Sequence, residues 1–153
     1  MRVLELKVPP PAVALATAVL MWLASRSAPG LTFGFSSGAP VAAGLAAIGV
    51  IVAISGVVIF RRARTTLNPT KPEASSSLVS WGIYKITRNP MYLGLLLVLT
   101  AWAIFLSNWL AFLFLPLFVL YMDRFQIVPE EQALTNLFSG DFVAYQSRVR
   151  RWL

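Results

Sequence analysis

Polar, aromatic and acidic residues gather at two places in a chain that is otherwise strongly apolar. The first is the segment from Gly82 to Gly94, which reads Gly-Ile-Tyr-Lys-Ile-Thr-Arg-Asn-Pro-Met-Tyr-Leu-Gly and leads into an apolar run. The second is Pro129-Glu130-Glu131, which follows the next two apolar runs. Carboxylates accept hydrogen bonds from hydroxyl and amino groups, and tyrosine faces attract cations. Together, these residue types could bind a cationic, polyhydroxylated cofactor at one membrane face.

Taken singly, each of these residues also has an ordinary structural interpretation. Asn89 followed by Pro90 is a good helix start, because Asn caps helices and Pro suits the first helical position. The two tyrosines suit an aromatic belt at the membrane interface, and Arg88 suits a topology anchor. The acidic pair lies in a first helical turn, where carboxylates complement the helix dipole. The joint placement of these residues is therefore what favours a functional site.

The composition indicates an integral membrane protein. Of the 153 residues, 58% are hydrophobic and 12% are charged, whereas soluble domains have about 45–50% apolar and about 25% charged residues. The chain has no cysteine and no histidine, which excludes disulfides, His-based triads and most zinc sites, so no metal is expected. The net charge of +7 comes from basic residues beside apolar runs, which favours an anionic membrane surface over nucleic acid.

Four apolar segments predict four transmembrane helices, at Pro9–Ser25, Pro40–Phe60, Pro90–Leu106 and Asn108–Met122. A bilayer core needs about 20 residues, with a range of about 17–25, so the second segment fits and the others are short. The short link between the last two segments predicts an antiparallel hairpin, which brings their cytosolic ends together. Pro116 is expected to kink the last helix.

The basic residues predict that both termini are cytosolic. All but one of the 13 Lys and Arg residues fall on one side of the four-span arrangement, and Arg26 is the exception. A multi-pass protein of a prokaryotic inner membrane is therefore expected. Cleavage of the first span as a signal peptide is the alternative, with small residues from Ala24 to Ala28 as the exit, although Glu5 and the prolines at 9–11 weigh against it.

A single membrane domain of residues 1–153 is expected. Its parts are two N-terminal spans (1–60), a cytosolic loop (61–89), a helical hairpin (90–122) and C-terminal interfacial helices (123–153). Pro129 is expected to begin a short amphipathic helix that Ser139 and Gly140 break. A second helix places four apolar residues on one side, as suits the headgroup layer: Phe142, Tyr145, Val149 and Trp152.

These motifs resemble the isoprenylcysteine carboxyl methyltransferase and phospholipid methyltransferase family. The similarity covers about Leu78 to Leu153 and rests on Gly82-Ile83-Tyr84, Arg88-Asn89-Pro90-Met91-Tyr92-Leu93-Gly94, an apolar hairpin, Glu130-Glu131, Leu134, Phe138, Tyr145, Val149 and Arg151. The resemblance implies a multi-pass enzyme that takes a methyl group from S-adenosyl-L-methionine. By position, it implies these cofactor-binding residues: Ser76, Ser77, Leu78, Val79, Tyr84, Asn89, Pro90, Met91, Tyr92 and Glu130.

Three features depart from the family pattern. Asn89 stands where the family often has histidine, and a Gly-then-Tyr pattern appears here as Ser139 and Phe142. Gln126 stands where the isoprenylcysteine enzymes have an arginine implicated in acceptor binding, with Arg124 two residues earlier. These departures leave the acceptor open.

We therefore expect a methyltransferase that acts on a lipophilic acceptor at the cytosolic membrane face. Arg88 and Arg124 are expected to hold an anionic acceptor, and Glu131 to serve the cofactor or a basic acceptor. The acceptor is expected to arrive laterally from the bilayer, near the kinked fourth helix. Two alternatives stay open: a phospholipid N-methyltransferase with Glu131 as proton acceptor, and a non-catalytic membrane protein that retains the fold.

Overall fold

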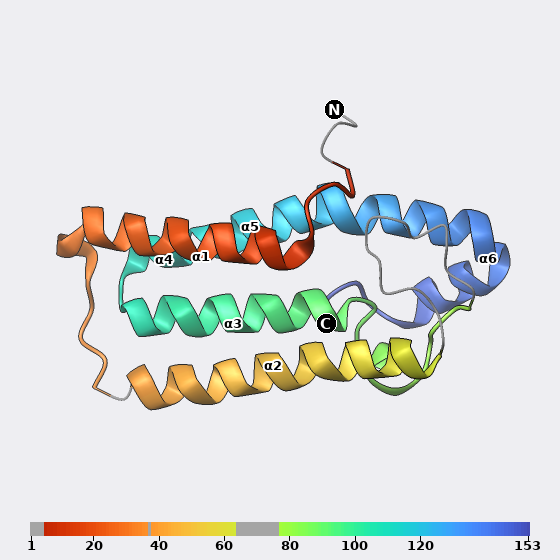
Figure 1. Cartoon of the computed structure of the whole chain (residues 1–153), viewed down its shortest axis with the longest axis horizontal. Coiled ribbons are helices and arrows are strands. Elements are labelled where there is room, and N and C mark those ends of the chain that lie inside the picture. The colour runs from red at the N-terminus through yellow and green to blue at the C-terminus, as the bar shows by residue number, and fades with distance from the viewer. Residues whose placement is uncertain (1–4, 37, 64–76) are drawn as a thin grey trace.

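The computed structural model describes residues 5–36, 38–63 and 77–153, and its regular elements there are helices. In Figure 1, α3 lies between α1 and α2, and α6 extends beyond their shared end. One isolated bridge, between Thr32 and Asn108, is the β pairing found in these ranges. The helices are α1 (Pro10–Ser27), η1 (Pro29–Leu31), α2 (Gly38–Arg62), η3 (Gly82–Lys85), α3 (Pro90–Leu106), α4 (Trp109–Phe112), α5 (Phe114–Met122), η4 (Asp123–Ile127) and α6 (Val128–Arg148).

The all-helical prediction is confirmed for the part of the chain that the structure describes. Two helices there are long and apolar enough to cross a membrane, namely α2 and the helical stretch Trp109–Arg148. The 40 residues of that stretch include the non-helical Ser139, so they do not form one straight helix. Asp123 and Arg124 follow its apolar first part, so the charged residues begin there. The count of four spans stays a prediction.

Close packing of α2 on α3 depends on two glycines. A Cβ atom on Gly94 would lie 2.5 Å from the Gly49 carbonyl oxygen and 2.7 Å from Cβ of Ala53. A Cβ atom on Gly49 would lie 2.8 Å from the Gly94 carbonyl oxygen. Small residues let helix backbones approach closely, which is how many membrane helices associate. This contact holds the first turns of α3 against α2.

The fourth apolar segment is interrupted, as its proline predicts, and the interruption lies at Leu113 between α4 and α5. Pro116 has no N–H, so it cannot donate to the Phe112 carbonyl one turn earlier. Asn108 caps α4 by accepting a hydrogen bond from the Leu110 amide at 2.9 Å. Its amide group also donates to the Ala28 carbonyl at 2.8 Å, which ties this end of the hairpin to α1.

Ser139 breaks α6, as predicted. Its backbone (φ 42°, ψ −117°) is not helical, and the chain turns back there (Figure 1). The returning half packs Phe142 and Tyr145 against Tyr84 in a small apolar core.

The predicted ends of two elements are corrected by the structure. The expected cytosolic loop over 61–89 begins later, because α2 continues to Arg62; residues 64–76 lie outside the described ranges. The last helix was expected to reach Trp152, but it ends at Arg148 and Val149 is extended. The physical reason is that the C-terminal segment hydrogen-bonds to the turn before α3, where the Arg88 amide donates to the Arg150 carbonyl at 3.0 Å.

Candidate functional site

The turn before α3 is fastened to the C-terminal segment. The Asn89 side chain does not cap α3 but donates to the Arg151 carbonyl at 3.0 Å. The Thr87 hydroxyl donates to the same carbonyl at 3.2 Å and accepts from the Asn89 amide at 3.2 Å. Pro90 still occupies the first helical turn, as its type favours. The side chain of Asn89 is thus engaged in tertiary structure and not in the helix cap that its residue type had predicted.

The helical hairpin brings the two polar motifs into direct contact. The Tyr92 hydroxyl, on the first turn of α3, donates a hydrogen bond to the Glu130 carboxylate on the first turn of α6. The adjacent acid, Glu131, binds two arginines from separate segments. Arg88 Nη2 lies 3.2 Å from its Oε1, and Arg151 Nη2 lies 2.7 Å from its Oε2. Neighbouring acids therefore have different partners.

A small cavity of about 60 Å³ lies between these groups. Eight of the predicted site residues line it: Ser77, Leu78, Val79, Tyr84, Arg88, Asn89, Glu130 and Glu131. Its other lining residues are Phe60, Leu134, Phe142 and Tyr145. Phe60 was not predicted as a site residue, although an aromatic residue at the cytosolic end of a predicted span is a signal that could have found it. The ring centroids of Phe60 and Tyr84 are 5.2 Å apart.

The remaining predicted residues lie in three different places. Tyr92, Pro90 and Met91 are on the first turn of α3, next to the cavity but not in its lining. Ser76 falls outside the described residues. Arg124 is exposed, pairs with Glu5 at 3.8 Å and lies over the Phe125 ring. The structure therefore does not bring Arg124 together with Arg88 at the cavity.

Burial shapes the electrostatics of the cavity. It raises the pKa of the Tyr84 phenol far above its usual value, so this hydroxyl stays protonated at any physiological pH. Within the described residues this hydroxyl has no hydrogen-bond partner. Glu130 lies beyond the charged residues that end the apolar part of its helix, and burial raises the pKa of its carboxyl group to about 8. Its neighbour Glu131 raises the pKa of Arg151, mainly through their hydrogen bond.

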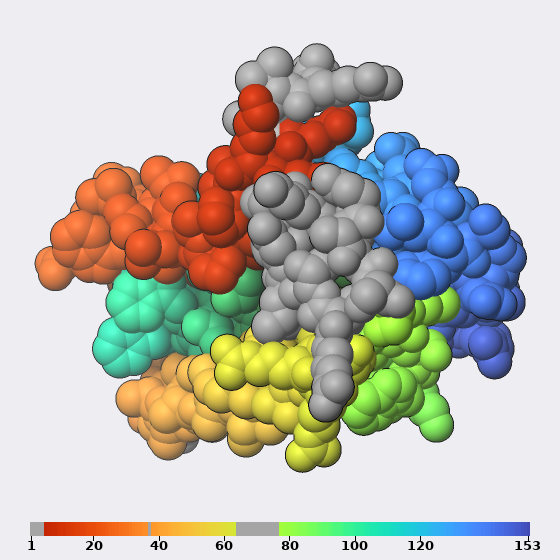
Figure 2. Space-filling view, turned by 45° about the vertical axis from the view of Figure 1, so that its right-hand side comes forward, coloured from red at the N-terminus to blue at the C-terminus, as the bar shows by residue number. Residues whose placement is uncertain are grey.

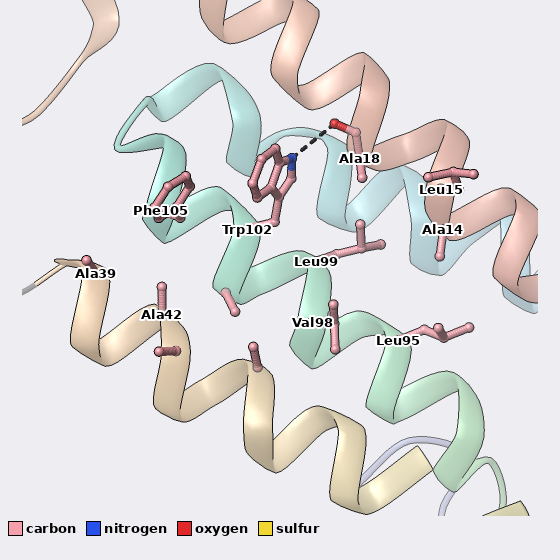
Figure 3. A pocket seen from close by; sticks show the side chains of 13 residues that line it. Ala14, Leu15, Ala18, Ala39, Ala42, Leu95, Val98, Leu99, Trp102 and Phe105 are labelled. Atoms are coloured by element: carbon pink, nitrogen blue, oxygen red, sulfur yellow. Dashed lines mark hydrogen bonds between the residues drawn. The ribbon is translucent and has the colours of Figure 1, made fainter. Parts of the chain in front are cut away.

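A second, larger cavity of about 640 Å³ is almost entirely apolar and lies between α1 and α2, with α3 as its floor. Figure 3 shows Leu95, Leu99, Trp102 and Phe105 of α3 along it, with alanines on the two flanking helices. In the space-filling view, green-to-teal atoms of α3 and of the residues directly after it are visible between α1 and α2 (Figure 2). The indole N–H of Trp102 donates to the Ala18 carbonyl at 3.0 Å, which fixes the ring at the groove (Figure 3). We call this cavity the alanine groove.

The described residues contain no group of three His, Cys, Asp or Glu side chains that could hold a metal ion. The arrangement instead offers hydrogen-bond acceptors, an unpaired phenol, aromatic faces and a guanidinium within one cavity at the end of apolar helices. These groups suit a polar organic ligand, and an apolar groove lies nearby.

Comparison with known proteins identifies the family. Residues 39–141 match the family described as phospholipid methyltransferase. This match covers more than half of the chain, so the chain belongs to the phospholipid methyltransferase family. An uncharacterized protein from Haemophilus influenzae is 46% identical over 63 residues, which are 41% of this chain and 100% of that protein. No solved structure matches the chain significantly. The chain is thus a membrane protein of a methyltransferase family.

Proposed function

We propose that this protein is an S-adenosylmethionine-dependent methyltransferase that modifies a lipophilic acceptor at the cytosolic membrane face. The observation that supports the proposal most is the meeting of Tyr84, Asn89 and Glu130 at one cavity. These residues come from separate motifs, and the family resemblance assigned each of them to the cofactor. Their convergence beside apolar helices supports a site where a water-soluble cofactor and a lipid meet.

The residues at the cavity suit the proposed cofactor. When bound, S-adenosylmethionine supplies an electrophilic methyl group on a sulfonium. The Glu130 carboxylate can accept hydrogen bonds from ribose hydroxyls or from the α-ammonium group. Tyr84 supplies an aromatic face and an unpaired hydroxyl donor within the described residues. The cavity of about 60 Å³ is smaller than usual ligand pockets of about 300–1,000 Å³, so its walls have to separate when the cofactor binds.

The chemistry asked of the protein is mainly orientation. Direct displacement at a methyl carbon needs the acceptor atom in line with the leaving group, and alignment can supply about 7–11 kcal/mol in favourable cases. The hydrogen bond from Tyr92 to Glu130 links α3 to α6, so the Glu130 carboxylate has a defined position beside the cavity. Exclusion of water protects the reacting groups from competing hydrolysis.

The alanine groove is the proposed place for the acceptor's hydrocarbon chain. It begins at Leu95, about one turn beyond the site residues at the start of α3, and its lining is apolar. This location differs from the expected one beside the fourth apolar helix. A lipid lying along α3 would present its polar end to the cavity and keep its chain in the groove.

The phospholipid N-methyltransferase alternative is favoured by the family's description. An amine acceptor must lose a proton, and Glu131 was expected to take it. Its pairing with Arg88 and Arg151 weighs against that role, because guanidinium groups already occupy both oxygens of its carboxylate.

One assay separates these functions. The purified protein is incubated with methyl-labelled S-adenosylmethionine and total membrane lipid, and labelled lipids are identified. A methyl ester releases volatile methanol on alkaline treatment, whereas an N-methylated headgroup retains the label. Cofactor binding without any labelled lipid would support the non-catalytic alternative, and the absence of cofactor binding at millimolar concentration would refute the proposal.

The proposed orientation places both termini and the cavity in the cytoplasm, as the distribution of basic residues indicates. A reporter that is active only in the cytoplasm should be active when it is fused after Leu153. Activity of a periplasmic reporter at the same position would contradict the four-span arrangement.

A further inference from the structure

Arg88 has unused hydrogen-bonding capacity at the cavity. Its Nη2 lies 3.2 Å from Glu131 Oε1, and its side chain is only 13% exposed. Its Nε and Nη1 atoms are buried and have no hydrogen-bond partner among the residues that the structure describes. Leaving buried N–H donors of a cation unsatisfied is unfavourable, so such donors usually have a partner in the functional state. Since Arg88 lines the cavity, a ligand there is the natural partner.

The guanidinium is held in place from two sides. Its backbone amide donates to the Arg150 carbonyl at 3.0 Å, and Glu131 holds its Nη2 atom. Glu131 is itself fixed by Arg151, whose Nε and Nη2 atoms lie 3.2 Å and 2.7 Å from its two oxygens. Glu131 therefore has the geometry of a positioning residue that orients Arg88.

We propose that Arg88 binds the α-carboxylate of the methionine end of S-adenosylmethionine, and that Glu131 positions it; this rests on the proposed function. Glu130 and Arg88 line the same cavity, and together they offer an anion and a cation to a zwitterionic amino acid. Guanidinium groups bind carboxylates through strong charge-assisted hydrogen bonds. The inference moves Arg88 from the acceptor, where the sequence placed it, to the cofactor.

The same chemistry would suit the phosphate or carboxylate of an acceptor lipid. Two observations favour the cofactor. Arg88 shares its cavity with Tyr84, Asn89 and Glu130, the residues assigned to the cofactor. The alanine groove is proposed for the acceptor, and none of the described residues that line it is charged.

The test compares S-adenosylmethionine with its decarboxylated form, which keeps the sulfonium and the amine but lacks the carboxylate. Calorimetry with the full-length protein in detergent should show that the wild type prefers the carboxylated cofactor by about tenfold to hundredfold, the range for a hydrogen bond to a charged group. Arg88→Gln should weaken binding of S-adenosylmethionine and leave binding of the decarboxylated form nearly unchanged, which brings the ratio close to one.

Three further variants make the test specific. Arg88→Lys keeps the charge, so it should retain part of the preference and serves if Arg88→Gln does not fold. Glu131→Gln should reduce the preference because Arg88 loses its support. Arg148→Gln is the matched control, since Arg148 is exposed and its side chain donates to the Ala144 carbonyl of its own helix; it should keep the wild-type ratio.

Each outcome has one meaning. Equal wild-type affinity for the two cofactors overturns the inference and leaves the proposed function intact. A ratio that Arg88→Gln does not change, or a loss of equal size for both ligands, also overturns it. An unchanged ratio with a raised acceptor KM assigns Arg88 to an anionic lipid. Failure of the wild type to bind either compound would instead contradict the proposed function itself.

Discussion

At the scale of single residues, two neighbouring acids have separate environments. Glu130 accepts a hydrogen bond from the Tyr92 hydroxyl, whereas Glu131 lies between Arg88 and Arg151. The sequence could only treat them as a pair, because an acidic dipeptide in a first helical turn does not reveal which partners approach each carboxylate. Their environments give Glu130 the ligand-binding role and Glu131 the positioning role in our proposal.

We predict that Glu130→Gln damages cofactor binding more than folding. Loss of a helix-dipole acid should lower stability by about 0.3–1 kcal/mol. Loss of a charged hydrogen-bond acceptor should weaken binding by about 1.5–3 kcal/mol, or roughly tenfold to hundredfold. Calorimetry and thermal unfolding in detergent measure the two effects. If the variant unfolds at a lower temperature but binds cofactor normally, Glu130 serves the helix alone.

The same residue predicts a pH dependence. Burial raises the pKa of the Glu130 carboxyl group to about 8, so below that pH the free protein holds it mostly protonated. A cationic cofactor favours the ionised form, so its affinity should increase with pH by about tenfold per unit and level off above pH 8. Calorimetry across this range should also detect proton release on binding. The effect should disappear in Glu130→Gln; a wild-type profile that matches the variant's would contradict this prediction.

At the scale of elements, the site depends on how closely α3 approaches α2. Gly94 has no room for a Cβ atom beside Gly49 and Ala53. The sequence showed Gly94 inside a conspicuous motif, but nothing in it indicated which helix would pack there. The contact requires the three-dimensional arrangement of two segments far apart in the chain.

Gly94→Ala should therefore destabilise the protein, although alanine favours helices. A methyl group 2.5 Å from the Gly49 carbonyl oxygen forces the helices apart, and such overpacking costs about 1–3 kcal/mol. Gly44→Ala is the matched control, because a Cβ atom on Gly44 meets nothing within 4 Å. Thermal unfolding in detergent should show a lower midpoint for Gly94→Ala and an equal or higher one for the control. Equal midpoints for Gly94→Ala and wild type would contradict the prediction, because they would show that the helices accommodate the methyl group without a loss of stability.

At the scale of the whole molecule, local patterns predicted the elements better than the contacts between them. Pro90 and Pro116 placed a helix start and a break correctly, because proline acts on the backbone locally. The pair Ser139-Gly140 placed the break in α6. The sequence did not predict that the helix ends at Arg148, because the apolar periodicity continues to Trp152. The helix ends there because the C-terminal segment forms tertiary hydrogen bonds with the turn before α3. Arg124 could not be placed either, because its partner Glu5 lies at the other end of the chain.

The alanine groove is likewise a property of the whole molecule, since it needs three helices to form. Small side chains on α1 and α2 leave its space open above α3 (Figure 3). Alanines scattered through apolar segments are ordinary in a membrane helix, so no sequence pattern distinguishes these ones. Its volume of about 640 Å³ lies within the range of about 300–1,000 Å³ that is usual for ligand sites.

Ala46→Phe should fill part of this groove and exclude the acceptor's chain. Ala46 lines the groove from α2 and does not line the polar cavity. Cofactor affinity should therefore be unchanged, while the acceptor KM rises by about tenfold, equivalent to ~1.4 kcal/mol of lost binding. Gly44→Phe is the control, because it adds a similar ring to α2 at an open position outside the groove.

If both variants turn over the acceptor with wild-type KM, the chain of the acceptor lies elsewhere. If both bind the cofactor more weakly, the substitution distorts α2, and the smaller change Ala46→Leu should then raise the acceptor KM alone if the groove holds the acceptor.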